Sequence, residues 1–230
     1  MSYYYQENRG GFLSNIPVVT KNLLLVNILV FIATLFNENL MIEKFGLFYF
    51  NSPFFRWWQP ITHMFMHGGF WHIFFNMYTL FIFGTVLERI LGPKKFIFFY
   101  MVCGLGAAAM QMGTQYLEMQ SFLASDSQAA VQGIVALKST PTVGASGAIY
   151  GVLIGYAMLF PDSKMTLLFP PVTLSAKWMV VIFAAIELFT GVVGWADGIA
   201  HFAHLGGMLI GWLLIIWWRR RGVLFNRNSL

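Results

Sequence analysis

Two polar residues in this sequence carry the groups needed to attack a carbonyl carbon. Ser146 has a hydroxyl and His204 an imidazole, which together can act as nucleophile and base in acyl transfer. His72 and Asn76 are two further polar residues within an apolar stretch. Their spacing of four residues places both on one face of a helix. A serine paired with a histidine base indicates acyl transfer through a serine nucleophile.

All four residues lie in apolar stretches of a chain that has too few charges to face water. The 230 residues are 58% hydrophobic and only 10% charged, whereas soluble domains carry about 25% charged residues. Aromatic residues make up 18%, which is typical of lipid-facing helices with interfacial anchors. The net charge of +5 comes from helix ends, so we expect a lipid bilayer as partner and no nucleic acid. Cys103, the only cysteine, is expected to be a small packing residue.

Six stretches are apolar enough for membrane-spanning helices, although some barely reach the required length of about 20 residues. They cover residues 22–38, 69–88, 95–116, 145–160, 176–194 and 200–218. The aromatic segment 39–68 contains Pro53 and Pro60 and is expected to lie on or partly in the membrane interface. The polar segment 117–143 is expected to be a solvated loop. The predicted fold is all-α, a polytopic membrane bundle of six helices.

Lysine and arginine predict the orientation of the bundle, because cytoplasmic loops are enriched in both. With six spans the termini share a side, and that side holds eleven of the 14 basic residues. We therefore expect a cytoplasmic N-terminal segment over 1–21, a six-helix membrane domain over 22–218 and a basic cytoplasmic tail over 219–230. No basic region runs directly into an apolar core at the N-terminus, so we expect no cleaved signal or transit peptide. A bacterial plasma membrane is the expected location.

The second, fourth and sixth helices are predicted to run in the same direction, so the depths of their polar residues can be compared. The fourth must end near Pro161, since proline cannot continue it, and Ser146 lies fifteen residues earlier. His204 lies fifteen residues before Arg219, where the sixth helix meets the interface. Both then lie roughly 22 Å above the cytoplasmic boundary, within a hydrocarbon core about 30 Å thick. His72 and Asn76 of the second helix fall in the same layer. Polar groups at membrane depth are costly, so this layer indicates a functional site.

Glycine stripes predict how the fourth and sixth helices pack. The glycines are Gly147, Gly151 and Gly155 in the fourth helix, and Gly207 and Gly211 in the sixth. Small residues at such spacing let helix backbones approach closely, which would bring the Ser146 hydroxyl toward His204. Ser146 also lies in the first turn of its helix, where free backbone N–H groups can donate to an oxyanion.

A catalytic metal is the chemical alternative, because the chain has five histidines and zinc favours such ligands. The sequence lacks an HExxH motif, however, which would supply two ligands and a base on one helix. We therefore expect no metal and no organic cofactor. His63, His67 and His201 are expected to be structural residues near the outer interface.

Glu187 is a polar residue whose role the sequence leaves open. It lies midway along the fifth predicted helix, where it either pairs inside the bundle or faces the cavity in its protonated form. Asp197 lies seven residues before His204 and is expected nearer the surface. Since no acid is placed near His204 by the sequence alone, a Ser–His dyad is favoured over a triad.

Four motifs of this sequence, in this order, resemble those of the rhomboid intramembrane serine proteases of the bacterial six-helix type. They are HxxxN at His72–Asn76, the end of the second helix at Leu87–Arg89 with Gly92, GxSG at Gly144–Gly147, and AHxxGxxxG at Ala203–Gly211. The resemblance extends from about Trp57 to Trp218. It implies an all-α bundle with a membrane-embedded loop between the first two helices and both termini in the cytoplasm.

The resemblance also implies roles for individual residues and a class of substrate. Ser146 corresponds to the nucleophile, His204 to the general base, and His72 and Asn76 to side chains of the oxyanion hole. The implied supporting residues are Tyr150, on which the catalytic imidazole packs, and Gly144, whose backbone lies close to the site. The implied substrates are transmembrane proteins, cleaved in or near their membrane helices.

The sequence departs from the family pattern in the loop between the first two helices. Trp58-Gln59 stands where the family often has Trp-Arg, with Arg56 just before it, so the anchoring of this loop is left open. Two other functions are also left open. An inactive rhomboid-like protein would bind membrane clients without cleaving them, although such relatives usually lack the serine or the histidine. A transporter would be a third possibility, but no inverted repeat is visible.

Overall fold

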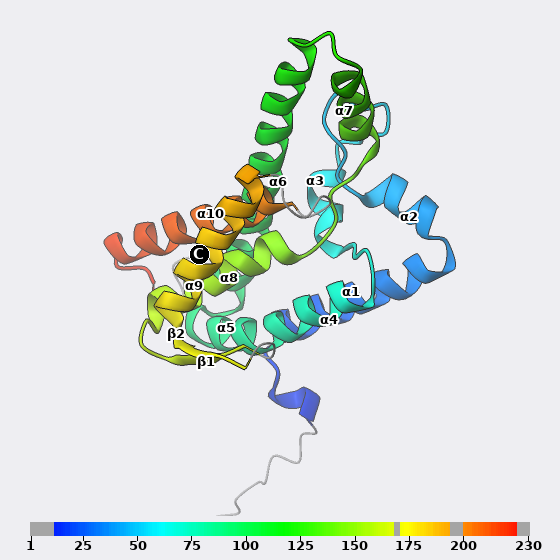
Figure 1. The fold of residues 1–230 in the computed structure, drawn as a ribbon. Coiled ribbons are helices and arrows are strands. Elements are labelled where there is room, and N and C mark those ends of the chain that lie inside the picture. Colours follow the sequence, from blue (N-terminus) through cyan, green and yellow to red (C-terminus); the bar gives the residue numbers. More distant parts are fainter. Residues whose placement is uncertain (1–11, 168–170, 194–199, 225–230) are drawn as a thin grey trace, which may run out of the picture.

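A computed structural model of the chain describes residues 12–167, 171–193 and 200–224, which form a bundle of helices with one short pair of strands (Figure 1). Five helices within these ranges are long and apolar enough to cross a membrane. They are α1 (Val18–Phe36), the continuous helix Phe70–Leu91, α6 (Pro93–Leu123), α9 (Ala176–Val193) and α10 (His201–Arg220). A sixth, α8 (Ser146–Leu159), is apolar but shorter. All six predicted helices are present, and five have both ends within four residues of the predicted bounds.

Shorter elements connect these helices. They are η1 (Phe12–Asn15), α2 (Glu38–Phe45), α3 (Gln59–Thr62), η2 (His63–Phe65), α7 (Gln128–Ser139), β1 (Lys164–Thr166) and β2 (Thr173–Ser175). The helix Phe70–Leu91 consists of α4 (Phe70–Thr79), a π-helical stretch η3 (Leu80–Gly84) and α5 (Thr85–Leu91). The strands β1 and β2 pair in antiparallel register, with Met165 opposite Leu174. This hairpin joins α8 to α9.

The prediction of a loop over 117–143 is wrong about its conformation. Helix α6 continues to Leu123, and α7 follows after a short turn. Figure 1 shows the end of α6 and α7 as a helical hairpin that projects from the bundle. The polar side chains of this segment report exposure to water, while its alanine, leucine, methionine and glutamine residues are good helix formers. Polarity was therefore a poor guide to its conformation.

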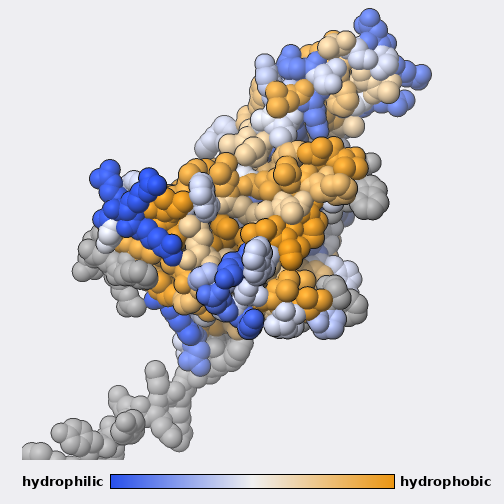
Figure 2. Space-filling model, turned by 60° about the vertical axis from the view of Figure 1, so that its left-hand side comes forward, coloured by the Kyte–Doolittle hydropathy of each residue, from blue (hydrophilic) through white to orange (hydrophobic). Residues whose placement is uncertain are grey.

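The outer surface of the bundle is apolar over a broad belt (Figure 2). Large apolar side chains of α1 and α9 are exposed, including Leu35 at 70% and Val192 at 72%. Hydrophilic residues gather instead at the tip of the hairpin formed by α6 and α7 and at other edges of the body (Figure 2). An exposed apolar belt around helices of this length is the surface expected of a protein immersed in lipid.

Helix α8 lies in the interior, beside α6, α9 and α10 (Figure 1). Glycines on both helices set the distance between α8 and α10. A Cβ added at Gly207 on α10 would lie 1.8 Å from the carbonyl oxygen of Gly147 on α8, and one added at Gly211 would lie 2.9 Å from the carbonyl oxygen of Gly151. Backbones this close leave no room for side chains. The prediction that the glycine faces of these two helices meet is confirmed for Gly147 and Gly151, whereas Gly155 faces Phe99 and Leu87 instead. We call Gly147, Gly151, Gly207 and Gly211 the glycine seam.

A buried carboxylate holds the start of α1 against α5. Glu88 accepts hydrogen bonds from the backbone N–H groups of Val19 and Thr20, at 2.9 and 2.7 Å, and from the Thr20 hydroxyl at 2.8 Å. The first N–H groups of a helix have no partner within it, and a negative charge there also complements the helix dipole. Glu88, which belongs to the Leu87–Arg89 motif, therefore caps the N-terminus of α1.

Candidate active site

Ser146 and His204 are within hydrogen-bond distance inside the bundle. Ser146 is the first residue of α8, and His204 lies in the first turn of α10. The Ser146 Oγ atom is 2.7 Å from His204 Nε2. The glycine seam lies directly beyond this pair, so close backbone packing of α8 and α10 brings the hydroxyl to the imidazole. A hydroxyl in this geometry can pass its proton to the ring nitrogen.

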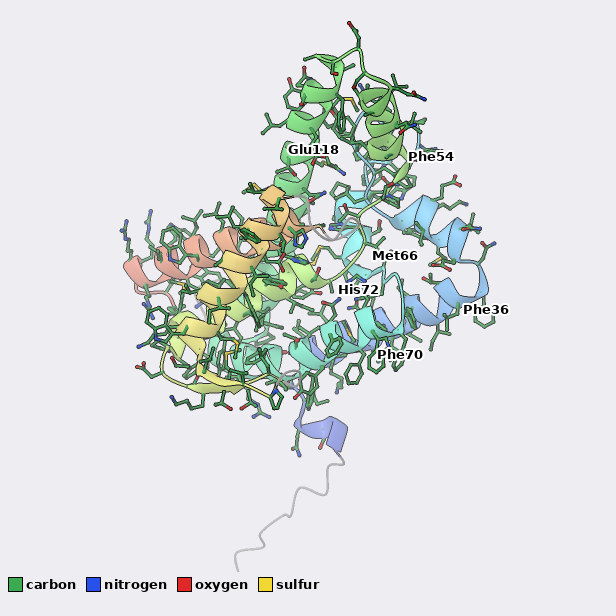
Figure 3. The ribbon with its side chains drawn as sticks, viewed as in Figure 1. Phe36, Phe54, Met66, Phe70, His72 and Glu118 are labelled. Atoms are coloured by element: carbon green, nitrogen blue, oxygen red, sulfur yellow. The ribbon has the colours of Figure 1, made fainter. Side chains whose placement is uncertain are left out.

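Gly144 brings His72 close to the serine. Its φ angle is +136°, a conformation that residues with a side chain rarely adopt. A Cβ added at this position would lie 2.8 Å from His72 Nε2 and 3.4 Å from Ser146 Oγ. The absence of a side chain at Gly144 therefore lets the His72 ring approach Ser146. Figure 3 shows His72 toward the interior of the bundle, while Phe70, at the start of the same helix, lies toward its edge.

Asn76 lies one turn further along α4 and is 6% exposed. Within the described part of the chain, its amide nitrogen Nδ2 has no hydrogen-bond partner. Buried polar atoms are rarely left without a partner. An unpaired N–H donor one turn from His72 is thus available to a group that enters the site.

Tyr150 packs against the imidazole of His204. The two rings are stacked, with centroids 4.3 Å apart and an angle of 10° between their planes. Tyr150 lies on α8 one turn after Ser146, so one helix supplies both the hydroxyl at the edge of the imidazole and the surface beneath it. This stacking limits the tilt of the imidazole ring.

Glu187 is the polar neighbour of His204 that the sequence did not place. Its Oε1 atom is 2.9 Å from His204 Nδ1, although the direction of this contact departs from that of a straight hydrogen bond. The Tyr150 hydroxyl donates to the same oxygen, and His201 Nδ1 lies 2.6 Å from Oε2. We call these four residues the Glu187 cluster. Of the two states considered for Glu187, the structure favours pairing within the bundle. Asp197, the other acid considered, lies outside the described residues.

The loop before α4 positions the segment that leads to Ser146. Leu47 and Thr142 exchange two backbone hydrogen bonds, and the Gly144 N–H donates to the His63 carbonyl at 2.9 Å.

Gln59 is fully buried and holds the loop together. Its side chain accepts from the N–H groups of Phe48 and Arg56 and donates to the carbonyls of Glu43 and Phe54. In this chain the glutamine of Trp58-Gln59 is an anchor of the loop.

The remaining histidines are buried or paired. Burial lowers the pKa of His63 to about 4 and that of His67 to about 3, with the neighbouring His72 adding to the second shift. Both are therefore neutral at pH 7. His63 Nδ1 contacts the Gln59 carbonyl at 3.0 Å, and the His67 ring packs edge-on against His72.

The described ranges contain no group of three or more histidine, cysteine, aspartate or glutamate side chains placed to hold a metal ion. The arrangement instead combines a hydroxyl, an imidazole, a carboxylate and nearby N–H donors. The hydroxyl, the imidazole and the N–H donors are the components required for acyl transfer through a serine nucleophile.

Comparisons with known proteins show the family to which the chain is similar. The Rhomboid domain family matches residues 54–221. Rhomboid protease AarA of Providencia stuartii is 30% identical over 225 residues, which cover 91% of this chain and 75% of AarA. The putative rhomboid protease YdcA of Bacillus subtilis is 27% identical over 161 residues, covering 70% of this chain and 68% of YdcA.

A mitochondrial relative is also similar over the membrane region. Rhomboid protein 1 of Saccharomyces cerevisiae is 30% identical over 168 residues, which cover 73% of this chain but only 43% of the yeast protein. The match of the family to most of the chain, together with the helices long enough to span a bilayer, identifies a multi-pass integral membrane protein that belongs to the rhomboid family.

Proposed function

We propose that this protein is an intramembrane serine endopeptidase in which Ser146 is the nucleophile and His204 the general base. The observation that carries the proposal is the 2.7 Å contact between Ser146 Oγ and His204 Nε2. A serine hydroxyl is a weak nucleophile until a neighbouring base accepts its proton. The relatives described as rhomboid proteases support the same activity.

The oxyanion would be held by three N–H donors beside the serine. They belong to the His72 ring, the Asn76 amide and the backbone of Ser146. The free Nδ2 of Asn76 and the position of Ser146 at the start of α8 support this assignment. In soluble serine proteases one such donor lowers the barrier by about 3 to 4 kcal/mol. Gly144 and Tyr150 would support the site by letting His72 approach and by holding the imidazole of His204.

The reaction would proceed in two steps. Ser146 Oγ forms a bond to the carbonyl carbon while its proton moves to His204 Nε2. The carbon–nitrogen bond then breaks, and His204 gives the proton to the leaving amine. A water molecule next attacks the acyl-enzyme: His204 takes one of its protons, the water oxygen becomes part of the new carboxyl group, and Ser146 recovers its hydroxyl hydrogen.

The substrates would be transmembrane proteins whose cleaved segment can leave the helical conformation. An intact helix engages its carbonyls in hydrogen bonds four residues apart, so a stretch of small or weakly helical residues should be cleaved most readily. We further propose that both termini are cytoplasmic and that the protein resides in a bacterial plasma membrane. Residues 1–21 and 219–230 would then flank a membrane protease domain over 22–218.

Labelling with a fluorescent fluorophosphonate tests the proposal most directly. The purified protein in detergent should become labelled, and Ser146→Ala and His204→Ala should both lose the label because one removes the nucleophile and the other its base. Each variant should keep the thermal unfolding midpoint of the wild type. Well-folded wild-type protein that is neither labelled nor able to cleave a transmembrane substrate would favour a client-binding protein instead.

Asn76→Ala tests the oxyanion assignment separately. Losing one donor should lower the turnover number by about 100-fold or more, with little change in unfolding midpoint. Turnover at the wild-type rate in folded Asn76→Ala protein would exclude Asn76 from this role.

A further inference from the structure

The proposed reaction uses a serine and a histidine and leaves one buried acid without a role. Glu187 is 7% exposed, while its neighbours Ile186 and Leu188 on α9 are 51% and 52% exposed. The helix therefore turns its carboxylate into the bundle and its apolar side chains outwards. A carboxylate at membrane depth is costly unless other groups hold it.

The position of this carboxylate relative to the imidazole is specific. Ser146 contacts Nε2 of His204, and Glu187 contacts Nδ1, the opposite ring nitrogen. The three side chains come from α8, α10 and α9, so only the folded bundle brings them together. The stacked Tyr150 ring holds the plane of the imidazole, and its hydroxyl donates to the same Glu187 oxygen.

We propose that Glu187 is a positioning residue that orients the His204 ring and stabilises its protonated form. This inference rests on the proposed protease function. An ionised carboxylate only accepts hydrogen bonds, so it favours the form of His204 whose proton is on Nδ1. Nε2 is then free to accept the Ser146 proton. Once it has done so, the negative charge of Glu187 stabilises the imidazolium across a short distance in a water-poor interior.

A purely structural role for Glu187 is the rival explanation. His201 Nδ1 is nearer to the carboxylate than His204 Nδ1, at 2.6 against 2.9 Å, and the Thr190 hydroxyl lies 3.1 Å from His201. In that case Glu187 would mainly fasten α9 to the start of α10. The two roles predict opposite effects on a small reagent. If Glu187 only links α9 to α10, its loss leaves the access of the reagent to Ser146 unchanged or improves it. If Glu187 positions His204, its loss slows the reaction of Ser146 with the reagent.

The experiment compares the full-length wild type with Glu187→Gln, Glu187→Asp and Thr190→Val in detergent. For each, two quantities are measured: the rate constant of fluorophosphonate labelling, and the turnover number and KM for a transmembrane substrate. Glutamine keeps the size of the side chain and removes its charge, while aspartate keeps the charge on a shorter side chain. Thr190→Val removes a polar group one turn along α9 and serves as the matched control.

The expected result is a parallel fall in labelling rate and turnover number for Glu187→Gln, on the order of 100-fold, with KM and unfolding midpoint unchanged. Glu187→Asp should recover part of both rates, and Thr190→Val should match the wild type. The inference is overturned if Glu187→Gln labels at the wild-type rate, whether or not its KM rises.

If Glu187→Gln does not fold, the labelling rate of Glu187→Asp decides, and an unchanged rate again overturns the inference. The proposed function is tested in the same experiment by the wild type. Wild-type protein that labels no faster than Ser146→Ala overturns both proposals, whereas an active wild type with an equally active Glu187→Gln overturns only this one.

Discussion

Helix α8 meets two of its neighbours, α10 and α9, by different means. The glycine seam joins α8 to α10, and there the backbone of one helix touches the backbone of the other. The polar contact of α8 with α9 runs through the Glu187 cluster, in which the Tyr150 hydroxyl reaches the carboxylate across the gap between the helices. The remaining contacts on that side are made by apolar side chains such as Leu153 and Val180.

This difference shows how two requirements of the candidate site are met separately. The seam sets the distance between Ser146 and His204, and no side chain in it can move aside to absorb a change. The Glu187 cluster sets the orientation of the His204 ring through side chains, which can be altered one atom at a time. Changes in the seam should therefore act on folding, and changes in the cluster on rate.

The largest effect is expected from Gly207→Ala. The added methyl would overlap the Gly147 carbonyl oxygen, and neither backbone can yield without separating α8 from α10. Overpacking a core commonly costs 1 to 3 kcal/mol, and a clash with backbone should cost more than about 3 kcal/mol. We expect a lower unfolding midpoint and loss of fluorophosphonate labelling.

A matched control for the seam is Gly113→Ala in α6, where an added Cβ meets no atom within 4 Å. It should be neutral or slightly stabilising, because alanine favours the helix over glycine by about 1 kcal/mol. If Gly207→Ala and Gly113→Ala had the same unfolding midpoint, the seam would not set the distance between the helices.

A smaller effect is expected from Tyr150→Phe in the Glu187 cluster. Phenylalanine keeps the ring stacked on His204 but removes the hydrogen bond to Glu187. The loss of about 1 kcal/mol from one hydrogen bond corresponds to roughly fivefold in kcat/KM. The unfolding midpoint should change little.

Tyr156→Phe is the control for this change, since Tyr156 lies on the same helix and packs against Phe83. Its kcat/KM should equal that of the wild type. Equal losses in the two variants would mean that a phenol hydroxyl on α8 affects the protein in some general way, and that the bond to Glu187 has no special part.

The smallest effect is expected from Asp162→Asn, which tests whether surface charge also fastens α9. Asp162 and Lys177 form an ion pair at 2.7 Å at the start of α9, with side chains 80% and 49% exposed. Exposed pairs contribute little, because water already solvates both charges. The unfolding midpoint and the labelling rate should both be unchanged, and a clear fall in either would show that α9 depends on this pair.

Much of the fold could be predicted because lipid imposes a simple requirement on sequence. Each spanning helix needs a long apolar run, so the six helices were visible as such. The hairpin of α6 and α7 was not predicted, because water solvates polar side chains equally well on a helix and in a loop. The anchoring role of Gln59 was not predicted, since its four backbone partners are up to 16 residues away along the chain.

The order of residues along the chain is enough to specify which chemical groups the site contains and how they are spaced along each helix. A period of 3.6 residues fixes Ser146 above Tyr150 and His72 above Asn76 whatever the rest of the chain does. The glycine spacing likewise determined which faces of α8 and α10 could meet. The contact between Glu187 and His204, in contrast, depends on the packing of the helices. The direction of a side chain on α9 relative to α10 depends on how the two helices are rotated against each other. Packing of the whole bundle sets that rotation, and no pattern within α9 records it.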